Sequence, residues 1–307
     1  MDPDDLAAAV EVFQGAGYRA LEAQNEPAWR QIYLEFADWE NAERIVADHL
    51  EPVLMARDHQ GDVSAWWFIR KHPCWRLRLR LGAPRTVAEA RLEAALHSLV
   101  EGGHLRRWWP GIYEPETLAF GGGLAMDVAH DLFTADSRCI LAMSQHGPHA
   151  LGRRELSVLL STTLMRGAGL EWYEQGDAWD RVTQERPLPS GISSERLDAL
   201  ARDLRTLVLA DSAPDGPLWG SSGPGAFAGD WAGSFRRAGG KLGSAARSGR
   251  LERGLRHVLA YHVIFHWNRL GLPLRTQSAL AWAARAAILD VPTSALSYSL
   301  PPQASRP

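Results

Sequence analysis

The pattern of apolar and polar residues predicts three strands in the first third of the chain. Residues 31–36 and 75–81 alternate with a period of two, which is the signature of a strand with one buried face, and the apolar, aromatic run at 64–71 also reads as a strand. The second and third strands are separated by His72 and Pro73. Because successive side chains of a strand point to opposite faces, each strand presents an apolar row to a core.

Apolar residues at helical spacing predict that helices make up most of the remaining chain. Pro52 is expected to kink or divide the first helix, because proline removes a backbone donor. Asp136 or Ser137 is expected to cap a helix, since a short side-chain oxygen can accept an unpaired helical amide. Residues 216–235 are rich in Gly, Ser and Pro and predict a long loop or lid. The expected helices cover 40–56, 86–101, 124–134, 135–146, 156–170, 193–210, 253–272 and 276–289.

These elements predict an α+β fold in which mixed or antiparallel sheets pack against helices. A length of 307 residues suits one catalytic body over residues 1–290, either undivided or in two lobes of about 1–150 and 151–290. Residues 291–307 are expected to form a peripheral tail. The stretch that precedes Tyr113 is rich in Trp, Pro and Gly, and we expect it to form a loop.

Composition narrows the class of protein. Hydrophobic residues make up 46% and charged residues 22%, which is ordinary for a globular protein. The net charge of -3 gives no basic face for nucleic acid. Cys74 and Cys139 lack the spacing of a zinc site or a disulfide framework. The chain shows no signal peptide and no apolar run that could span a membrane, so we expect a soluble, cytoplasmic protein. Its oligomeric state, a homodimer included, is left open.

The third predicted strand and the tryptophans supply candidates for peptide binding. Arg76, Arg78 and Arg80 share one strand face at intervals of about 7 Å, a row suited to carboxylates or peptide carbonyls. The alternation alone favours a solvated outer face by about two to one. Most of the 13 tryptophans are expected in the core, but a minority can line a cleft, and Trp67 and Trp75 are the candidates.

The predicted helix over 253–272 carries candidates for proton transfer. His262 and His266 are four residues apart and share a helical face. No third ligand supports a metal there, and Val263 stands where a zinc protease motif requires Glu, so we expect no metal. Either histidine is a general acid-base candidate if it faces a cleft, although a hydrogen-bonded core histidine is slightly favoured for each. Tyr113 and Tyr261 are candidate donors to an oxyanion.

Two motifs resemble the C-terminal, elimination-type domain of lantibiotic dehydratases, which also occurs alone as a thiopeptide-maturation enzyme. The run YEPETLAFGGG at 113–123 and a later Asp-Ser match one, and FIRKHPCWRLRLR at 68–80 matches a pattern whose arginines resemble a clamp for a glutamyl leaving group. The resemblance spans residues 29–290 and also covers Asn268 and Arg269. The matching residues are Phe68, Arg70, Pro73, Arg76, Arg78, Tyr113, Pro115, Glu116, Gly121, Gly122, Asp136 and Ser137.

Departures from these motifs separate the activities that the resemblance implies. Ala119 and Phe120 replace an Arg and an aromatic residue, so a cation expected there is missing. Lys71 replaces a Tyr, and Trp75 and Ile264 replace histidines. Elimination needs a cation for the departing glutamate and a base for the α-proton, whereas cycloaddition needs orientation of two alkenes and proton donors. The departures therefore favour cycloaddition.

The expected function is that of a thiopeptide pyridine synthase. It would join two dehydroalanines by a formal aza-[4+2] cycloaddition, with macrocyclisation and loss of water and the leader peptide. A glutamate-elimination enzyme and a non-catalytic leader-binding module are the alternatives. The expected partner is a modified precursor peptide, with no cofactor. Proton transfer is assigned to Tyr113, Tyr261, His262 and His266, and substrate contacts to Arg70, Arg76, Arg78, Trp67, Trp75, Glu116, Asn268 and Arg269.

Overall fold

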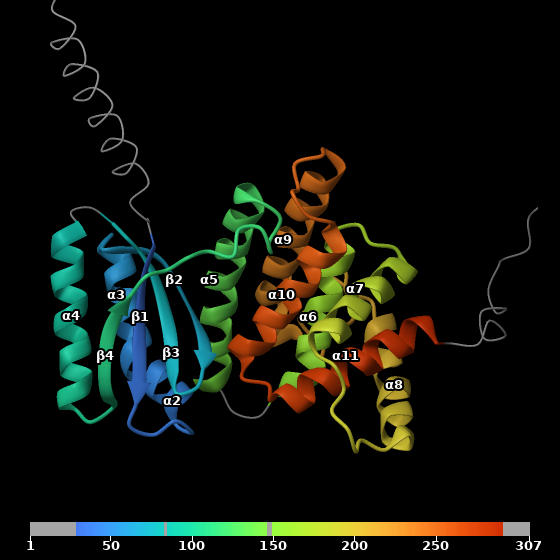
Figure 1. Cartoon of the computed structure of the whole chain (residues 1–307), viewed down its shortest axis with the longest axis horizontal. Helices are drawn as coiled ribbons and strands as arrows, with labels where there is room; N and C mark the ends of the chain where they lie inside the picture. The colour runs from blue at the N-terminus through green and yellow to red at the C-terminus, as the bar shows by residue number, and fades with distance from the viewer. Residues whose placement is uncertain (1–28, 83–84, 146–148, 291–307) are drawn as a thin grey trace, which may run out of the picture.

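In the computed structural model of the chain, which describes residues 29–82, 85–145 and 149–290, an antiparallel sheet lies beside a bundle of helices (Figure 1). Neighbouring strands pair in the order β2-β3-β1-β4, and every pairing is antiparallel. The predicted α+β class is confirmed. The strands are β1 (Trp29–Phe36), β2 (Val63–Lys71), β3 (Cys74–Leu81) and β4 (Leu105–Gly111).

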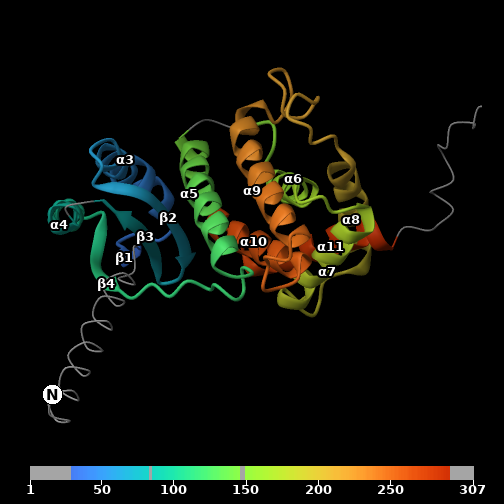
Figure 2. The same ribbon diagram turned by 90° about the horizontal axis from the view of Figure 1, so that it is seen from above.

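Helices cover one face and one edge of this sheet and build a second, helical part of the molecule. They are α2 (Ala42–Ile45), α3 (Glu51–His59), α4 (Arg85–Glu101), α5 (Gly123–Gln145), α6 (Arg153–Gly167), α7 (Trp172–Glu185), α8 (Ser194–Leu209), α9 (Gly229–Arg247), α10 (Leu255–Leu270) and α11 (Leu274–Leu289), with a π-helical segment η1 (Val46–Leu50) and a 3-10 turn η2 (Ala226–Ala228). α3 and α4 lie against the sheet, whereas α5 and α10 contact β2, its edge strand (Figure 2).

The two faces of the sheet differ in chemistry. Apolar residues fill the face toward α3 and α4, where they form one continuous core. The opposite face carries the arginines of β3, with Arg80 beside Trp29 and Arg78 beside Trp67. The predicted alternation of β3 is therefore confirmed. The apolar face consists of Ile32, Leu34, Phe36, Trp66, Phe68, Trp75, Leu77 and Leu79.

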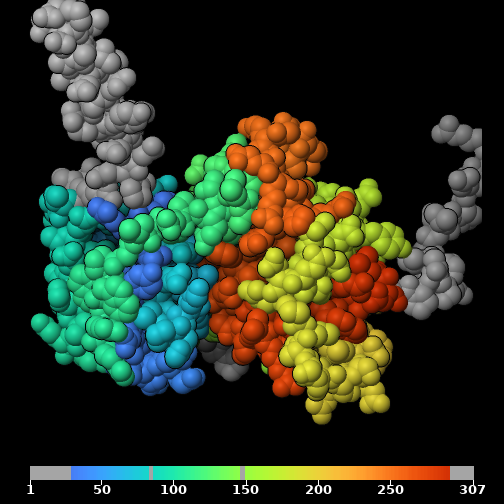
Figure 3. All heavy atoms as spheres, in the orientation of Figure 1, coloured from blue at the N-terminus to red at the C-terminus, as the bar shows by residue number. Residues whose placement is uncertain are grey.

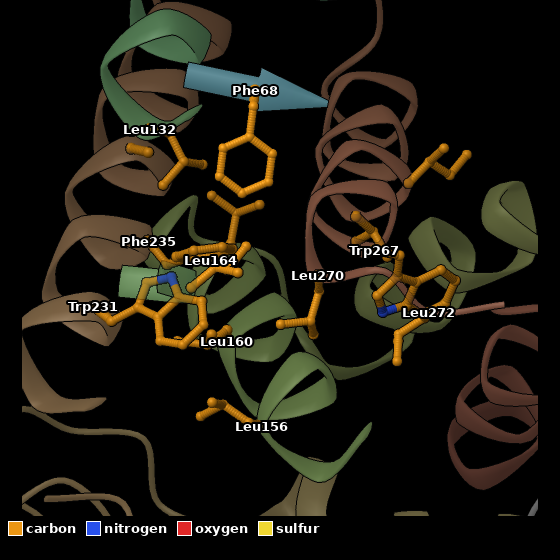
Figure 4. Close-up of a cluster of buried hydrophobic side chains, with 14 of the residues drawn as sticks. Phe68, Leu132, Leu156, Leu160, Leu164, Trp231, Phe235, Trp267, Leu270 and Leu272 are labelled. Carbon is orange, nitrogen blue, oxygen red and sulfur yellow. The ribbon is translucent and has the colours of Figure 1, made fainter. Parts of the chain in front are cut away.

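The helical part has an apolar core of its own. Leu156, Leu160 and Leu164 recur every four residues on α6, so they share one helical face. They lie toward Trp231 and Phe235 of α9 (Figure 4). Burial of one such side chain contributes roughly 1.5–3 kcal/mol, so this layer holds α6 and α9 together.

The predicted pair of helices over 124–134 and 135–146 is wrong. α5 runs unbroken from Gly123 to Gln145. Asp136 and Ser137 lie in its middle, fully buried, and so neither of them caps a helix. Both residues instead face neighbouring elements. The Ser137 hydroxyl accepts a hydrogen bond from the backbone amide of Phe68 at 3.2 Å, which ties α5 to β2.

Other element boundaries also differ from the prediction. The first helix changes to π-helical geometry at 46–50, before Pro52, which occupies the first turn of α3, where its missing donor costs nothing. α9 begins at Gly229, inside the predicted loop. β4 and α7 were missed. The Trp-rich run of β4 lacks a period of two, whereas Trp172, Trp179 and Val182 of α7 do lie at helical spacing, a signal that the sequence analysis did not use. The helices expected from 86, 156, 193, 253 and 276 onward correspond to α4, α6, α8, α10 and α11.

The predicted tail over 291–307 lies outside the described residues, and so does the acidic N-terminal stretch. Among the helices that the structure describes, none combines the length and apolar character that a membrane span requires.

Candidate active site

A hydrogen-bonded Tyr113–His130 pair forms the centre of the candidate site. The segment 112–122 leaves β4, crosses the arginine face of the sheet and enters α5 (Figures 1 and 3). It places the Tyr113 hydroxyl 2.8 Å from Nε2 of His130 on α5. Burial raises the pKa of Tyr113, and burial together with the charges of Arg78 and Arg80 lowers the pKa of His130 to about 4. At neutral pH the phenol therefore donates and the uncharged imidazole accepts.

Arg78 lies against the same tyrosine. Its guanidinium carbon is 4.5 Å from the ring centre of Tyr113 and 4.3 Å from that of Trp67, so the cation stacks on two aromatic faces. Nε donates to Oε1 of Gln31 at 3.0 Å, while Nη1 has no hydrogen-bond partner among the described residues. Burial lowers the pKa of Arg78 to about 10, so it stays charged at neutral pH. Exposed Glu116 adds a negative charge nearby.

A pocket of about 540 Å³ adjoins this pair on the His130 side. It lies between the sheet and α5, and His130 is part of its wall. Arg80 lines the pocket and donates to the Ser64 hydroxyl at 3.0 Å, while Arg138 donates to Asp58 at 2.9 Å. The pocket thus combines cations, carboxylates and a neutral base, a lining suited to a polar peptide backbone.

The segment 112–122 is fixed at its far end by two glycines. Gly121 and Gly122 have φ angles of 92° and 102°, a left-handed region that other residues rarely adopt. The Gly121 carbonyl accepts a hydrogen bond from the amide of Glu252 at 3.0 Å, just before α10 begins. The predicted tight turn is therefore present, and it anchors the tyrosine segment to the helical part.

Aromatic side chains fill the position of the missing cation. Phe120 is fully buried, with its ring centre 5.3 Å from Phe133, 5.0 Å from Phe265 and 5.0 Å from His262. Ala119 packs against this cluster. Burial lowers the pKa of His262 to about 3, and neither of its ring nitrogens has a hydrogen-bond partner among the described residues. His262 is therefore a neutral residue enclosed by aromatic rings.

His266 and Arg269 belong to a different, buried network around Asp136, in which His266 Nε2 and both terminal nitrogens of Arg269 have no hydrogen-bond partner among the described residues. The carboxylate accepts hydrogen bonds from His266 Nδ1 at 2.9 Å, Arg269 Nε at 2.7 Å and Trp231 Nε1 at 2.8 Å. Burial favours a raised pKa for Asp136, but the charges of His266 and Arg269 hold the pKa below its ordinary value. The side chains of Asp136, His266 and Arg269 are 0% exposed, so this ion cluster joins α5, α9 and α10 internally.

His262 and His266 were predicted to transfer protons only if they face a cleft. His262 is 1% exposed and His266 is 0% exposed, and neither is part of the pocket walls described above and below. Tyr261 is half-buried at the rim of the Phe120 cluster, with Arg253 stacked 5.0 Å from its ring centre. His130 lines a pocket and His262 and His266 do not, which distinguishes them from the Tyr113–His130 pair.

The arginines expected to act together are divided between the two faces of the sheet. Strand pairing sets Arg70 opposite Trp75, on the apolar face, where its guanidinium lies 4.6 Å from the Trp75 ring. Arg70 donates to Glu43 at 2.5 Å and to the Arg269 carbonyl at 2.7 Å. Arg76 remains on the other face, half-buried and 5.6 Å from the ring of Tyr33.

Arg70 and Trp75 line a second pocket, of about 310 Å³, together with Asn268. Asn268 Oδ1 accepts a hydrogen bond from Gln277 at 3.1 Å. Glu43 also binds Arg153, whose Nη1 donates to the carbonyl of Leu270 at 2.8 Å. These arginines satisfy carbonyls at the end of α10, which links the sheet to the helical part.

His130 is the residue of this site that the sequence analysis missed. A helical reading of α5 places it on one face with Met126, Phe133 and Ser137, at intervals of four, three and four residues. That periodicity carries a signal of a buried histidine on an apolar face. Its pairing with Tyr113 depends on how the intervening loop folds back, which no local pattern specifies.

Comparisons with known proteins agree with this fold. The family model described as "Lantibiotic biosynthesis dehydratase C-term" matches residues 29–288. The chain belongs to this family. The family resemblance inferred from the sequence motifs is thereby confirmed, and no curated protein sequence matches the chain.

Three solved structures share the fold of this family member. The tRNA dependent lantibiotic dehydratase MibB from Microbispora sp. 107891 has a TM-score of 0.64 and 22% identity, over 85% of this chain and 28% of MibB. TsrL has a TM-score of 0.58 and 18% identity, over 90% of this chain and 99% of TsrL. TbtD, a pyridine synthase from thiomuracin biosynthesis, has a TM-score of 0.57 and 16% identity, over 86% of this chain and 98% of TbtD. The TM-scores establish a common fold, and at identities this low the likeness shows the fold alone.

Proposed function

We propose that the protein is a pyridine-forming cyclase that acts on a precursor peptide containing two dehydroalanines. The observation that carries the proposal is the Tyr113–His130 pair, a neutral donor and a neutral acceptor at 2.8 Å beside a pocket of about 540 Å³. Ala119 stands where the resemblance implies an Arg in dehydratases, and it packs against the apolar cluster around Phe120, which supports cyclisation over elimination.

The proposed reaction consists of orientation and proton transfers. The amide that joins one dehydroalanine to the preceding residue first becomes an imidic acid, as a proton moves from its nitrogen to its oxygen. Two C–C bonds to the second dehydroalanine then close a six-membered ring. Loss of the ring hydroxyl as water and of the leader peptide as its amide leaves a pyridine. Each proton step suits a neutral base and a neutral acid, here His130 and Tyr113.

Arg78 is the proposed contact for a peptide carbonyl. Its buried Nη1 has no partner in the described structure and would need a local shift to meet a substrate, and a guanidinium binds carbonyl oxygens through charge-assisted hydrogen bonds. Trp67 and Glu116 support Arg78 by stacking and by charge. Arg76, on the same face of the sheet, is a proposed contact for precursor residues that flank the two dehydroalanines. The second pocket is proposed to bind further flanking residues of the precursor through Arg70, Trp75 and Asn268. The proposed role of the α10 residues is to hold α5, and with it His130, in place without contact to the substrate. These residues are Tyr261, His262, His266 and Arg269.

The test uses purified protein and a synthetic leader peptide fused to a core with two dehydroalanines. Mass spectrometry would detect a macrocycle with one pyridine and a released leader amide. We expect Tyr113→Phe and His130→Gln each to lower turnover by about 100-fold, the usual contribution of an acid-base group. Exposed Tyr173→Phe and His59→Gln serve as matched controls. Wild-type turnover by both site variants would overturn the assignment.

One observation favours glutamate elimination as the second candidate. Arg80 lines the pocket beside His130, so a cation for a departing glutamate and a base for an α-proton are both present. A peptide with glutamylated serine separates the candidates, because elimination would yield dehydroalanine and free glutamate without any ring. Tight binding of both peptides without conversion of either would instead support the leader-binding module.

A further inference from the structure

A second polar pocket lies in the helical part, away from the candidate active site. It measures about 480 Å³ and is enclosed by the turn between α6 and α7, by α7, and by the ends of α9 and α10 that follow each other in the chain. It shares no lining residue with the pocket beside His130. Its polar lining comes from Glu174, Arg181, Arg247, Arg256 and His257.

Two of the three arginines in this pocket have no carboxylate partner in the described structure. Arg256 is neutralised, since it binds Glu174 at 2.6 Å and Asp177 at 2.9 Å. Arg181 donates through Nη1 to Nε2 of His257 at 2.8 Å, and its buried Nε has no hydrogen-bond partner. Since Arg181 donates to that ring nitrogen, His257 is a neutral acceptor and leaves the charge of Arg181 uncompensated.

Arg247 is the second free cation. It is exposed, and its one hydrogen-bond contact in the described structure is a long one, 3.5 Å from Nη1 to the carbonyl of Ala168 at the end of α6. That carbonyl carries a partial charge only. Arg181 and Arg247 therefore bring two positive charges without a carboxylate partner in the described structure to one pocket, from helices α7 and α9, against the one negative charge left over in the Arg256–Glu174–Asp177 group.

The backbone adds to this positive potential. α10 begins at Leu255 with Gly254 as its N-cap, and no side chain caps the first amides of the helix. Such amides point along the helix axis toward a ligand, and the helix dipole favours negative charge at this end. Gly254 and Leu255 both line the pocket, so the first amides of α10 and the guanidinium groups of Arg181 and Arg247 border the same cavity.

We infer that this pocket binds an oxyanion, either a phosphate group or the carboxylates of an acidic peptide segment. Two guanidinium groups from different helices and an uncapped helix start converge on a volume that accommodates such a group. Bidentate contact by Arg181 and Arg247 supplies the strongest part of the binding. The inference does not depend on the pyridine-forming activity, because it concerns equilibrium binding at a separate place.

Calorimetry at low ionic strength tests the inference on the full chain, with inorganic phosphate and a hexaglutamate peptide as separate probes. We expect saturable binding of at least one probe by the wild type. Arg181→Gln combined with Arg247→Gln should weaken it by roughly tenfold or more, as loss of charge-assisted hydrogen bonds does. Arg237→Gln, an exposed residue of α9 that contacts Ser234 outside this pocket, is the control and should bind like the wild type.

The outcomes separate the two sources of the anion. Tight binding of phosphate with weak binding of hexaglutamate identifies a small free oxyanion, and the reverse identifies an acidic peptide segment. Arg247→Gln alone provides the test if the double variant melts early, because its exposed side chain contributes little to packing. Absence of saturable binding of both probes by the wild type overturns the inference, and so does unchanged binding by a folded Arg247→Gln variant.

Discussion

The two polar clusters on α5 use similar residue types for different purposes. Around Asp136, a carboxylate, a histidine and an arginine pair with one another at 0% exposure. Around His130, the Tyr113 hydroxyl bonds a histidine that is uncharged and forms part of a pocket wall, and Arg78 stacks on the tyrosine ring behind that wall. The first cluster joins three helices and lines none of the pockets described above, although His266 Nε2 and both terminal nitrogens of Arg269 have no hydrogen-bond partner among the described residues, whereas the second reaches a pocket through His130. Access to a pocket, rather than residue type, therefore separates a structural cluster from a candidate catalytic one.

The largest expected effect comes from breaking the cluster around Asp136. Asp136→Asn removes the carboxylate charge that compensates the buried Arg269 and weakens the acceptor for His266 Nδ1, so we expect a loss of about 3–5 kcal/mol of unfolding free energy, as for other broken buried pairs. Urea denaturation monitored by tryptophan fluorescence measures it. Asp131→Asn is the matched control, because this α5 carboxylate is 68% exposed and its pair with Lys241 is worth less than about 1 kcal/mol. Equal stabilities of the two variants would contradict the structural role of Asp136.

The cluster around His130 is expected to respond in activity rather than in stability. If Tyr113 and His130 form one proton-transfer unit, Tyr113→Phe with His130→Gln should lose no more turnover than either single change, about 100-fold. Each single variant should unfold within about 1.5 kcal/mol of the wild type, the net worth of one hydrogen bond. A double-mutant cycle on the dehydroalanine peptide measures the coupling. Additive losses in turnover would show that the two residues act separately.

Acid is expected to destabilise the protein through the buried, neutral His262. The pKa of His262 is about 3 in the folded protein against an ordinary 6.5, so the unfolded chain binds the extra proton first as pH falls. This contribution to stability is complete above pH 6.5 and is lost as pH falls toward 3. We expect His262→Leu to lose less unfolding free energy than the wild type between pH 7 and pH 4.5, by urea denaturation. An equal loss in both proteins would show that His262 is hydrated or paired.

Local patterns predicted the elements of this fold better than the contacts between them. The alternation of β3 placed Arg76 and Arg78 on one face correctly, because a period of two is a property of the strand alone. Arg70 was grouped with them, yet the register that sets it opposite Trp75 puts it on the other face. The side chain of Asp136 suits a helix cap, which is why the sequence predicts one. In the structure Asp136 lies inside α5 and accepts hydrogen bonds from residues of α9 and α10, contacts that no local pattern specifies.

The smallest expected effect concerns the turn that carries Tyr113 to α5. Gly122 has a φ of 102°, so Gly122→Ala should cost about 1 kcal/mol of backbone strain, whereas its contact with the end of the Glu252 side chain can relax. Gly123→Ala is the control, since no atom lies within 4 Å of an added Cβ and the residue begins α5. Thermal melting compares the two. Because the Gly121 carbonyl anchors this segment to Glu252, we also expect turnover to fall in Gly122→Ala and not in Gly123→Ala. Equal turnover in both would show that the position of Tyr113 does not depend on this turn.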